Sequence, residues 1–89
     1  MPCYVRALLI TVSPAEAEEA VKQHREGLRD LFHAGKLRSA GELEAGDGFV
    51  EIVEVADLHE AETLTRESPL IRDGLASWIL REWHEIKFP

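Results

Sequence analysis

The order of the secondary-structure elements that this sequence predicts is what most restricts its fold. Apolar runs, helical periodicity and turn residues divide the chain into strand, helix, strand, strand, helix and strand. The predicted elements cover residues 4–11, 14–34, 36–43, 49–56, 58–67 and 75–87, with an irregular stretch at about 68–74. This order within 89 residues is typical of a ferredoxin-like βαββαβ sandwich, an α+β fold in which a four-stranded antiparallel sheet carries two helices on one face. We expect a single domain spanning residues 1–89.

Capping residues mark the ends of the two predicted helices. Ser13 with Glu16 forms a capping box, and so does Asp57 with Glu60, because the side chains in each pair can satisfy backbone N–H groups at the helix start. Gly35 is expected to end the first helix in the left-handed conformation. Local signals and periodicity therefore agree on both helices.

Both faces of the predicted sheet are apolar. Alternate residues of the first strand place Val5, Ala7 and Leu9 on one face, and the opposite face is apolar as well. A sheet that is wetted on one side should instead alternate apolar with polar residues. The two helices cover only one face, so we expect a second copy of the chain to cover the other, in a face-to-face homodimer.

Composition and charge exclude several classes of partner. The formal net charge of −7 and the scattered Lys and Arg residues argue against nucleic acid. A lone Cys3 cannot form an internal disulfide, and no Cys/His group has the spacing of a metal site. We see neither a secretory signal nor an apolar run long enough for a membrane, and therefore expect a cytoplasmic protein.

His24 stands where the apolar stripe of the first helix calls for a hydrophobic residue. Its neighbours one turn away are Val21 and Leu28. An imidazole in that position is either a structural residue satisfied by a hydrogen bond or a group placed to exchange a proton in a pocket. The other histidines are predicted to be surface or strand residues: His33, His59 and His84.

Ser68 is the second candidate for a site residue. It precedes Pro69 in the segment that leaves the second helix, where the chain can lean back over the first helix and offer a hydroxyl to His24. The alternative is a serine that only ends a helix before a proline. Catalysis by a nucleophilic serine is not expected, because the sequence has no nucleophile-elbow motif.

Charged residues interrupt the apolar strands at Arg6, Glu51 and Arg81. They could face a cavity between two sheets, where a cation such as Arg6 would bind an anionic small molecule. Edge positions, or an ion pair between them, explain the same pattern.

A series of short, different motifs is spread along nearly the whole chain: HREGLRDL (24–31), AGKL (34–37), AG (40–41), DG (47–48), EVA (54–56), EA (60–61), SPL (68–70), GL (74–75) and REW (81–83). Taken in order, they resemble the YCII-related family of the dimeric α/β-barrel group. The resemblance implies a ferredoxin-like subunit, a face-to-face dimer, and a pocket in which a histidine at the position of His24 pairs with an aspartate in an Asp-Pro step. Ser68 stands at the position of that aspartate, so the charge that would orient the imidazole is missing from the motif. Asp73 or Glu67 could replace it.

The resemblance also implies a type of chemistry. Characterised members act on small cyclic or aromatic-derived acids by proton abstraction or elimination, a dehydrochlorinase among them, and the C-terminal half is also similar to muconolactone isomerases. We therefore hypothesise a cofactor-free lyase or isomerase in which His24 moves a proton on an anionic ligand that Ser68 and Arg6 position. The alternative is a non-catalytic homodimer that binds a small ligand or supports a larger enzyme. The substrate, and any assembly larger than a dimer, stay open.

Overall fold

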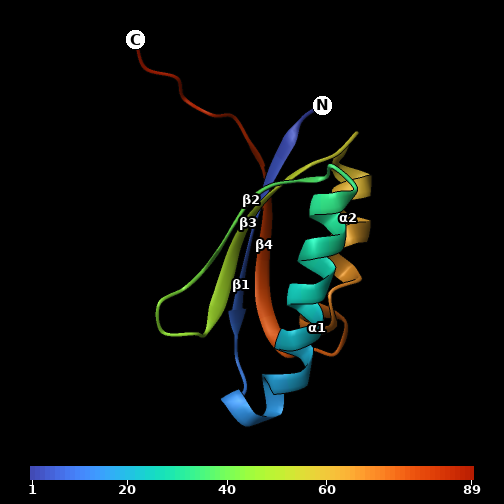
Figure 1. Cartoon of the computed structure of the whole chain (residues 1–89), viewed down its shortest axis with the longest axis vertical. Helices are drawn as coiled ribbons and strands as arrows, with labels where there is room; N and C mark the ends of the chain where they lie inside the picture. The colour runs from blue at the N-terminus through green and yellow to red at the C-terminus, as the bar shows by residue number, and fades with distance from the viewer.

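The fold is a four-stranded antiparallel sheet in the order β2-β3-β1-β4, with the helices on one of its faces (Figure 1). It is seen in a computed structural model that describes all residues, 1–89. The elements are β1 (Cys3–Ile10), α1 (Pro14–His33), β2 (Leu37–Glu42), β3 (Gly48–Glu54), α2 (Leu58–Arg66), α3 (Pro69–Arg72) and β4 (Ala76–Trp83). The predicted ferredoxin-like α+β sandwich is confirmed. No helix is long and apolar enough to cross a bilayer.

Both long helices begin as their capping residues predict. The Ser13 side chain accepts a hydrogen bond from the backbone N–H of Glu16 at 3.3 Å, and Asp57 accepts one from Glu60 at 2.9 Å. Gly35 follows α1 with a φ of 74°, a left-handed conformation that glycine adopts without strain. The capping signals therefore set the two helix starts that later position the site.

Two predictions near the C-terminus are wrong. The stretch at 68–74 is not irregular throughout but contains α3, which Pro69 begins because its fixed φ suits the first helical position. The last strand ends at Trp83 rather than at residue 87, because Trp83 pairs with Cys3 and β1 offers no residue beyond it. His84 therefore lies outside the strand, in an exposed extended segment that leads to the C-terminus (Figure 1).

The core lies between the sheet and the helices, in two clusters of buried apolar residues. One cluster consists of Leu8, Ala17, Ala20, Phe49 and Leu70, and the other of Tyr4, Val53, Val55, Ala61 and Leu80. Each cluster joins residues of β1 and β3 to helical residues, so the helices are anchored over the central strands. The polar residues described below lie on this same inner side of the sheet.

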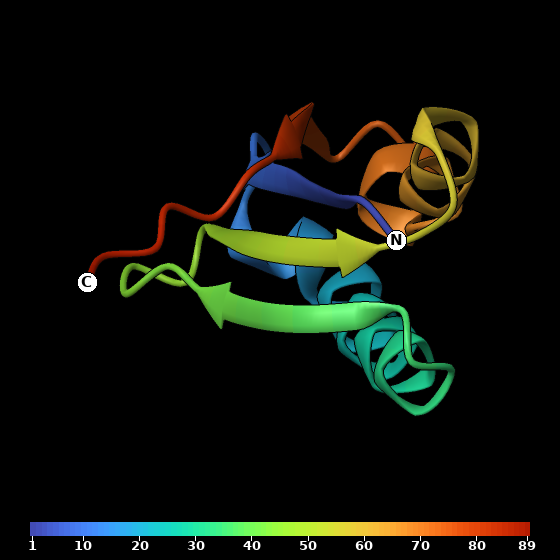
Figure 2. The same ribbon diagram turned by 90° about the horizontal axis from the view of Figure 1, so that it is seen from above.

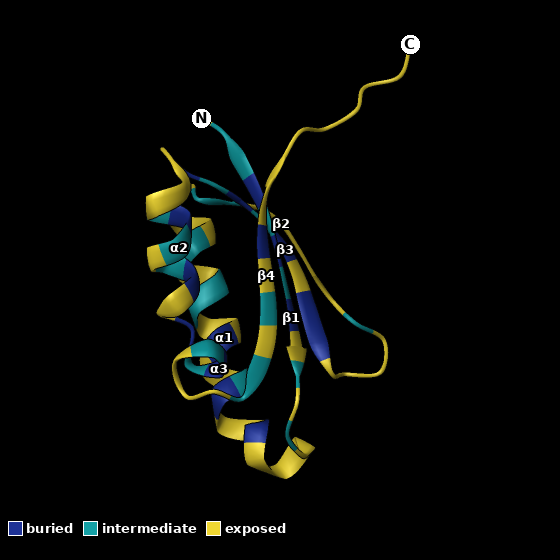
Figure 3. Ribbon diagram, turned by 180° about the vertical axis from the view of Figure 1, so that it is seen from behind, coloured by how far each residue is buried: buried dark blue, intermediate teal, exposed yellow.

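The opposite face of the sheet carries no helix (Figure 1), and Figure 3 shows exposed stretches along the strands. In Figure 2 the strands run side by side across this layer, with β2 at one edge and β4 at the other. Several large apolar side chains there are strongly exposed: Leu9 at 50%, Val50 at 41%, Ile79 at 52% and Trp83 at 43%. This surface, centred on Leu9, Val50 and Ile79, is called the open face below.

Candidate active site

All the buried polar side chains of the chain belong to one network. They are Arg6, His24, Glu51, Thr65 and Ser68. They come from β1, α1, β3, α2 and the residue that precedes α3, so the network joins the sheet to every helix. No fully buried side-chain nitrogen or oxygen lacks a hydrogen-bond partner. Because unpaired buried polar groups are costly, this network depends on all its members being in place.

The imidazole of His24 is held at both of its nitrogens. Nδ1 lies 2.7 Å from the Ser68 hydroxyl, and Nε2 lies 2.6 Å from Oε2 of Glu51. An ionised carboxylate only accepts hydrogen bonds, so Nε2 carries a proton, and in the neutral form of the ring Nδ1 accepts the Ser68 O–H. The result is a continuous chain of hydrogen bonds, Ser68–His24–Glu51, which we call the relay.

Arg6 holds the other oxygen of the same carboxylate. Arg6 and Glu51 are opposite each other in the β1–β3 register, and Nε donates to Oε1 across 2.5 Å. A second nitrogen, Nη1, donates to the Thr65 hydroxyl at 3.4 Å, which in turn donates to the carbonyl of Ala61 at 2.7 Å. The guanidinium therefore fixes the carboxylate that orients His24.

Glu51 is ionised in this environment. Burial raises the pKa of its carboxyl, but the hydrogen bond from His24, with the positive charge and hydrogen bond of Arg6, outweighs burial and holds the pKa below its ordinary value. At neutral pH Glu51 is thus a buried anion that both neutralises Arg6 and is ready to stabilise a protonated His24.

Ser68 is placed for His24 rather than for its own helix. It occupies the N-cap position of α3, where a serine usually accepts a backbone N–H, yet its side chain makes no such bond. Its hydroxyl is directed to His24 instead. The expected contact between the segment after α2 and the first helix is therefore present in the structure.

A cavity of about 320 Å³ opens beside the relay. We call it the inner cavity, and its lining consists of Arg6, Gln23, His24, Glu26, Gly27, Asp30, Leu31, Leu64, Glu67, Ser68 and Pro69. Its volume is at the lower end of the range for small-molecule sites. Both Ser68 and His24 line it, so the relay meets a space that a small compound can occupy.

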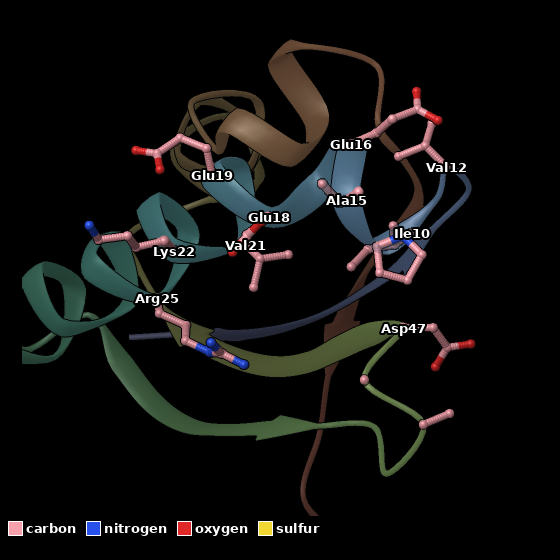
Figure 4. Close-up of a pocket in the computed structure, with 14 residues that line it drawn as sticks. Ile10, Val12, Ala15, Glu16, Glu18, Glu19, Val21, Lys22, Arg25 and Asp47 are labelled. Carbon is pink, nitrogen blue, oxygen red and sulfur yellow. The ribbon is translucent and has the colours of Figure 1, made fainter.

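A larger cleft of about 900 Å³ lies elsewhere, between the start of α1 and the turn before β3 (Figure 4). Figure 4 shows Lys22 and Arg25 of α1 on one side of it and Asp47 on the other. No residue of the relay lines this cleft. It has no buried titratable side chain, so size alone does not make it the chemical site. No group of three or more His, Cys, Asp or Glu side chains is arranged to hold a metal ion.

The structure brings three of the predicted site residues together and leaves Arg81 apart from them. His24, Ser68 and Arg6 all line the inner cavity. The interpretation that Arg6 and Glu51 face a cavity between sheets is wrong, because both point toward the helices and form the ion pair that was the alternative explanation. Arg81 is exposed and lies outside the network.

Sequence reasoning missed the role of Glu51. Neither Asp73 nor Glu67 supplies the orienting carboxylate, since Asp73 pairs with Arg72 and Glu67 only lines the cavity. Glu51 supplies it from β3. The signal was present in the sequence as a carboxylate between apolar residues of a strand, but the strand pattern did not tell which residue it would meet. Thr65 gave no comparable signal.

Comparison with known proteins places these features in a family. The model of the YCII-related domain matches residues 5–84. Among solved structures, 5-chloro-2-hydroxyhydroquinone dehydrochlorinase from Burkholderia phenoliruptrix AC1100, in complex with 2,5-dihydroxybenzoquinone, is similar with a TM-score of 0.76 and 16% sequence identity. The similarity covers 92% of this chain and 93% of that one, and at such low identity it shows a shared fold. No curated protein matches. Since the family model spans nearly the whole chain, this protein belongs to the YCII-related domain family.

Proposed function

We propose that this protein catalyses proton transfer on a small cyclic or aromatic-derived compound bound in the inner cavity, as a lyase or isomerase that needs no cofactor. The observation that carries the proposal is the relay itself, in which Ser68 connects His24 to the cavity and Glu51 holds the far side of the ring. The dehydrochlorinase of similar fold acts on a small cyclic compound, which supports this substrate class.

The geometry suggests how the proton moves. His24 has no free nitrogen, so the Ser68 oxygen is the atom that faces the substrate. As Ser68 gives its proton to Nδ1, it takes one from a carbon or oxygen of the substrate, and the serine is a hydroxyl again. His24 becomes a cation against the Glu51 carboxylate, and Arg6 stabilises the negative charge left on the substrate. Return of the proton at another atom completes an isomerisation, and departure of a leaving group completes an elimination.

A non-catalytic role is the second candidate. The His24 side chain is only 2% exposed and both of its nitrogens are paired, as expected for a histidine that only stabilises the core. In that case the inner cavity would bind a small ligand without changing it. The two candidates differ in whether removal of the relay abolishes a reaction.

We also propose that the protein works as a homodimer that buries the open face against the same face of a second copy. Its exposed apolar side chains lie on the central strands β1 and β3 and on the edge strand β4. A contiguous apolar patch of this kind marks an interaction surface. The extended segment after Trp83 leaves on the side away from the helices, where a second copy would lie (Figure 1).

Deuterium exchange tests the catalytic proposal without a known substrate. In D₂O, NMR would follow loss of C–H signals from a panel of cyclic carbon acids, such as cyclohexane-1,2-dione and cyclopentanone. We expect the protein to accelerate exchange of at least one compound, and the His24→Ala and Ser68→Ala variants each to lose about 100-fold or more of that acceleration. His59→Ala, which changes an exposed histidine at the start of α2, is the matched control and should keep it.

The outcome that overturns the catalytic proposal is equally specific. The catalytic proposal fails if no compound of the panel exchanges deuterium faster with the wild-type protein than with His24→Ala. It also fails if His24→Ala and Ser68→Ala both keep the full acceleration of exchange. Melting temperatures of the variants separate lost chemistry from lost folding.

A further inference from the structure

The charged side chains that line the inner cavity are almost all acidic. Glu26, Asp30 and Glu67 surround it, and none of them forms a salt bridge. The one cation in the lining, Arg6, is neutralised by Glu51 behind it. The cavity therefore carries an excess of negative charge at neutral pH. This electrostatic environment repels an organic anion and attracts a cation.

Arg6 nevertheless keeps one hydrogen-bonding nitrogen free. Its Nε donates to Glu51 and its Nη1 to Thr65, whereas Nη2 has no partner in the protein. Every fully buried side-chain nitrogen or oxygen has a hydrogen-bond partner, so Nη2, which has none, is not fully buried. Arg6 lines the inner cavity, which is therefore the space that Nη2 faces. A side chain that is only 3% exposed thus presents unpaired N–H groups to the cavity. Those groups call for an oxygen acceptor on a ligand.

We infer that the inner cavity selects a small compound with a hydrogen-bond-accepting oxygen for Arg6 and a positively charged amine for the carboxylates of Glu26, Asp30 and Glu67. This inference rests on the proposed function in that it assigns the substrate class of the same site, and it replaces the anionic ligand expected from the sequence. A carbonyl oxygen bound at Nη2 is also where negative charge develops when a neighbouring proton is removed. The cationic amine and the acceptor oxygen thus serve binding and chemistry respectively.

A matched pair of probes isolates the charge preference. Both 4-(aminomethyl)benzamide and 4-carbamoylbenzoate carry a carboxamide oxygen on the same ring, and they differ in having an ammonium or a carboxylate at the opposite position. NMR titration of the backbone amides would give the dissociation constants and the location of binding. We expect the ammonium compound to bind at least about tenfold more tightly at low salt, and the ratio to shrink as salt is added.

Two sets of variants tie that preference to the inner cavity. The triple variant Glu26→Gln, Asp30→Asn, Glu67→Gln should bring the ratio near one. The control is a triple variant that removes three negative charges at positions outside the cavity lining: Glu18→Gln, Glu44→Gln and Glu62→Gln. It should leave the ratio of the two dissociation constants unchanged. Gly27→Leu fills the cavity from α1, where a Cβ added to the glycine would meet no atom within 4 Å, and should abolish binding of both probes. Gly27→Ala, a smaller change that suits a helix, should weaken binding less.

The results separate this inference from the proposed function. Equal or tighter binding of the carboxylate probe, no binding of either probe, or binding that survives Gly27→Leu in a folded protein would each overturn the assigned ligand class. Preferential binding of the ammonium probe supports it whether or not deuterium exchange depends on His24. A loss of exchange in His24→Ala with preference for the carboxylate probe would uphold the chemistry and reject the ligand class.

Discussion

Arg6 and Glu51 face each other across the β1–β3 pair and form a salt bridge beneath the helices, with side chains only 3% and 0% exposed. Removing one charge of a buried pair leaves the other without compensation, which costs far more than the pair itself contributes. Here the carboxylate also serves His24, so the ion pair and the relay are a single structural unit.

Replacing one member of this pair is therefore expected to destabilise the fold more than replacing both. Glu51→Gln keeps the shape of the side chain but leaves the buried Arg6 guanidinium without a counter-charge. It should lower the free energy of unfolding by about 3–5 kcal/mol. Adding Arg6→Met to that variant should restore part of the loss, because no charge then remains unpaired. Urea denaturation of the two single variants and the double variant measures the coupling. Additive losses would show that the two charges act independently.

Acid should weaken the folded state through Glu51. Its carboxyl has a pKa below the ordinary value of 4.5, so the folded protein holds the ionised form more strongly than the unfolded chain does. The resulting stabilisation is fully present above pH 4.5 and is lost as the pH falls through the lower pKa of the folded state. Unfolding free energies measured from about pH 6 down to about pH 3 should therefore fall, and fall less steeply in Glu51→Gln. An identical pH dependence in that variant would contradict the assignment to Glu51.

The fold was predictable because local signals and the global pattern agree. The capping boxes at Ser13 and Asp57 fix both helix starts, and the order of elements leaves few antiparallel arrangements. The last strand was predicted too long because no turn residue follows Trp83 before Pro89, whereas strand length depends on the pairing with β1. The residue pattern of a segment indicates that it favours a strand, but the pairing with the neighbouring strand determines the residue at which the strand ends.

Most of the candidate site that could be predicted lies at positions where a residue contradicts its surroundings, and Ser68 was predicted instead from its place after the second helix. His24 stood out on an apolar helix stripe, and the structure places it beside the inner cavity. Glu51 stood out on an apolar strand, but its partners are 27 and 45 residues away along the chain. Which polar residues meet under the helices depends on the strand register and on the helix packing, and neither is encoded in local spacing. The acidic lining from Glu26, Asp30 and Glu67 was hidden among ordinary surface charges for the same reason.

A charge placed on the open face tests the proposed dimer. Ile79 pairs with Ala7 in the sheet and is 52% exposed on that face. We expect the protein to sediment at twice the 10.0 kDa of one chain, and Ile79→Glu to sediment as a single chain, because a carboxylate would be buried without a partner in the interface. Leu58→Glu is the matched control, since Leu58 is 47% exposed but lies on α2, on the other side of the sheet. A wild-type protein that stays monomeric at micromolar concentration would overturn the proposed dimer. A dimer that tolerates Ile79→Glu and is lost in Leu58→Glu would place the interface elsewhere. Such a result would leave the apolar surface of β1 and β3 without an occupant, while the relay on the inner side of the sheet would be unaffected.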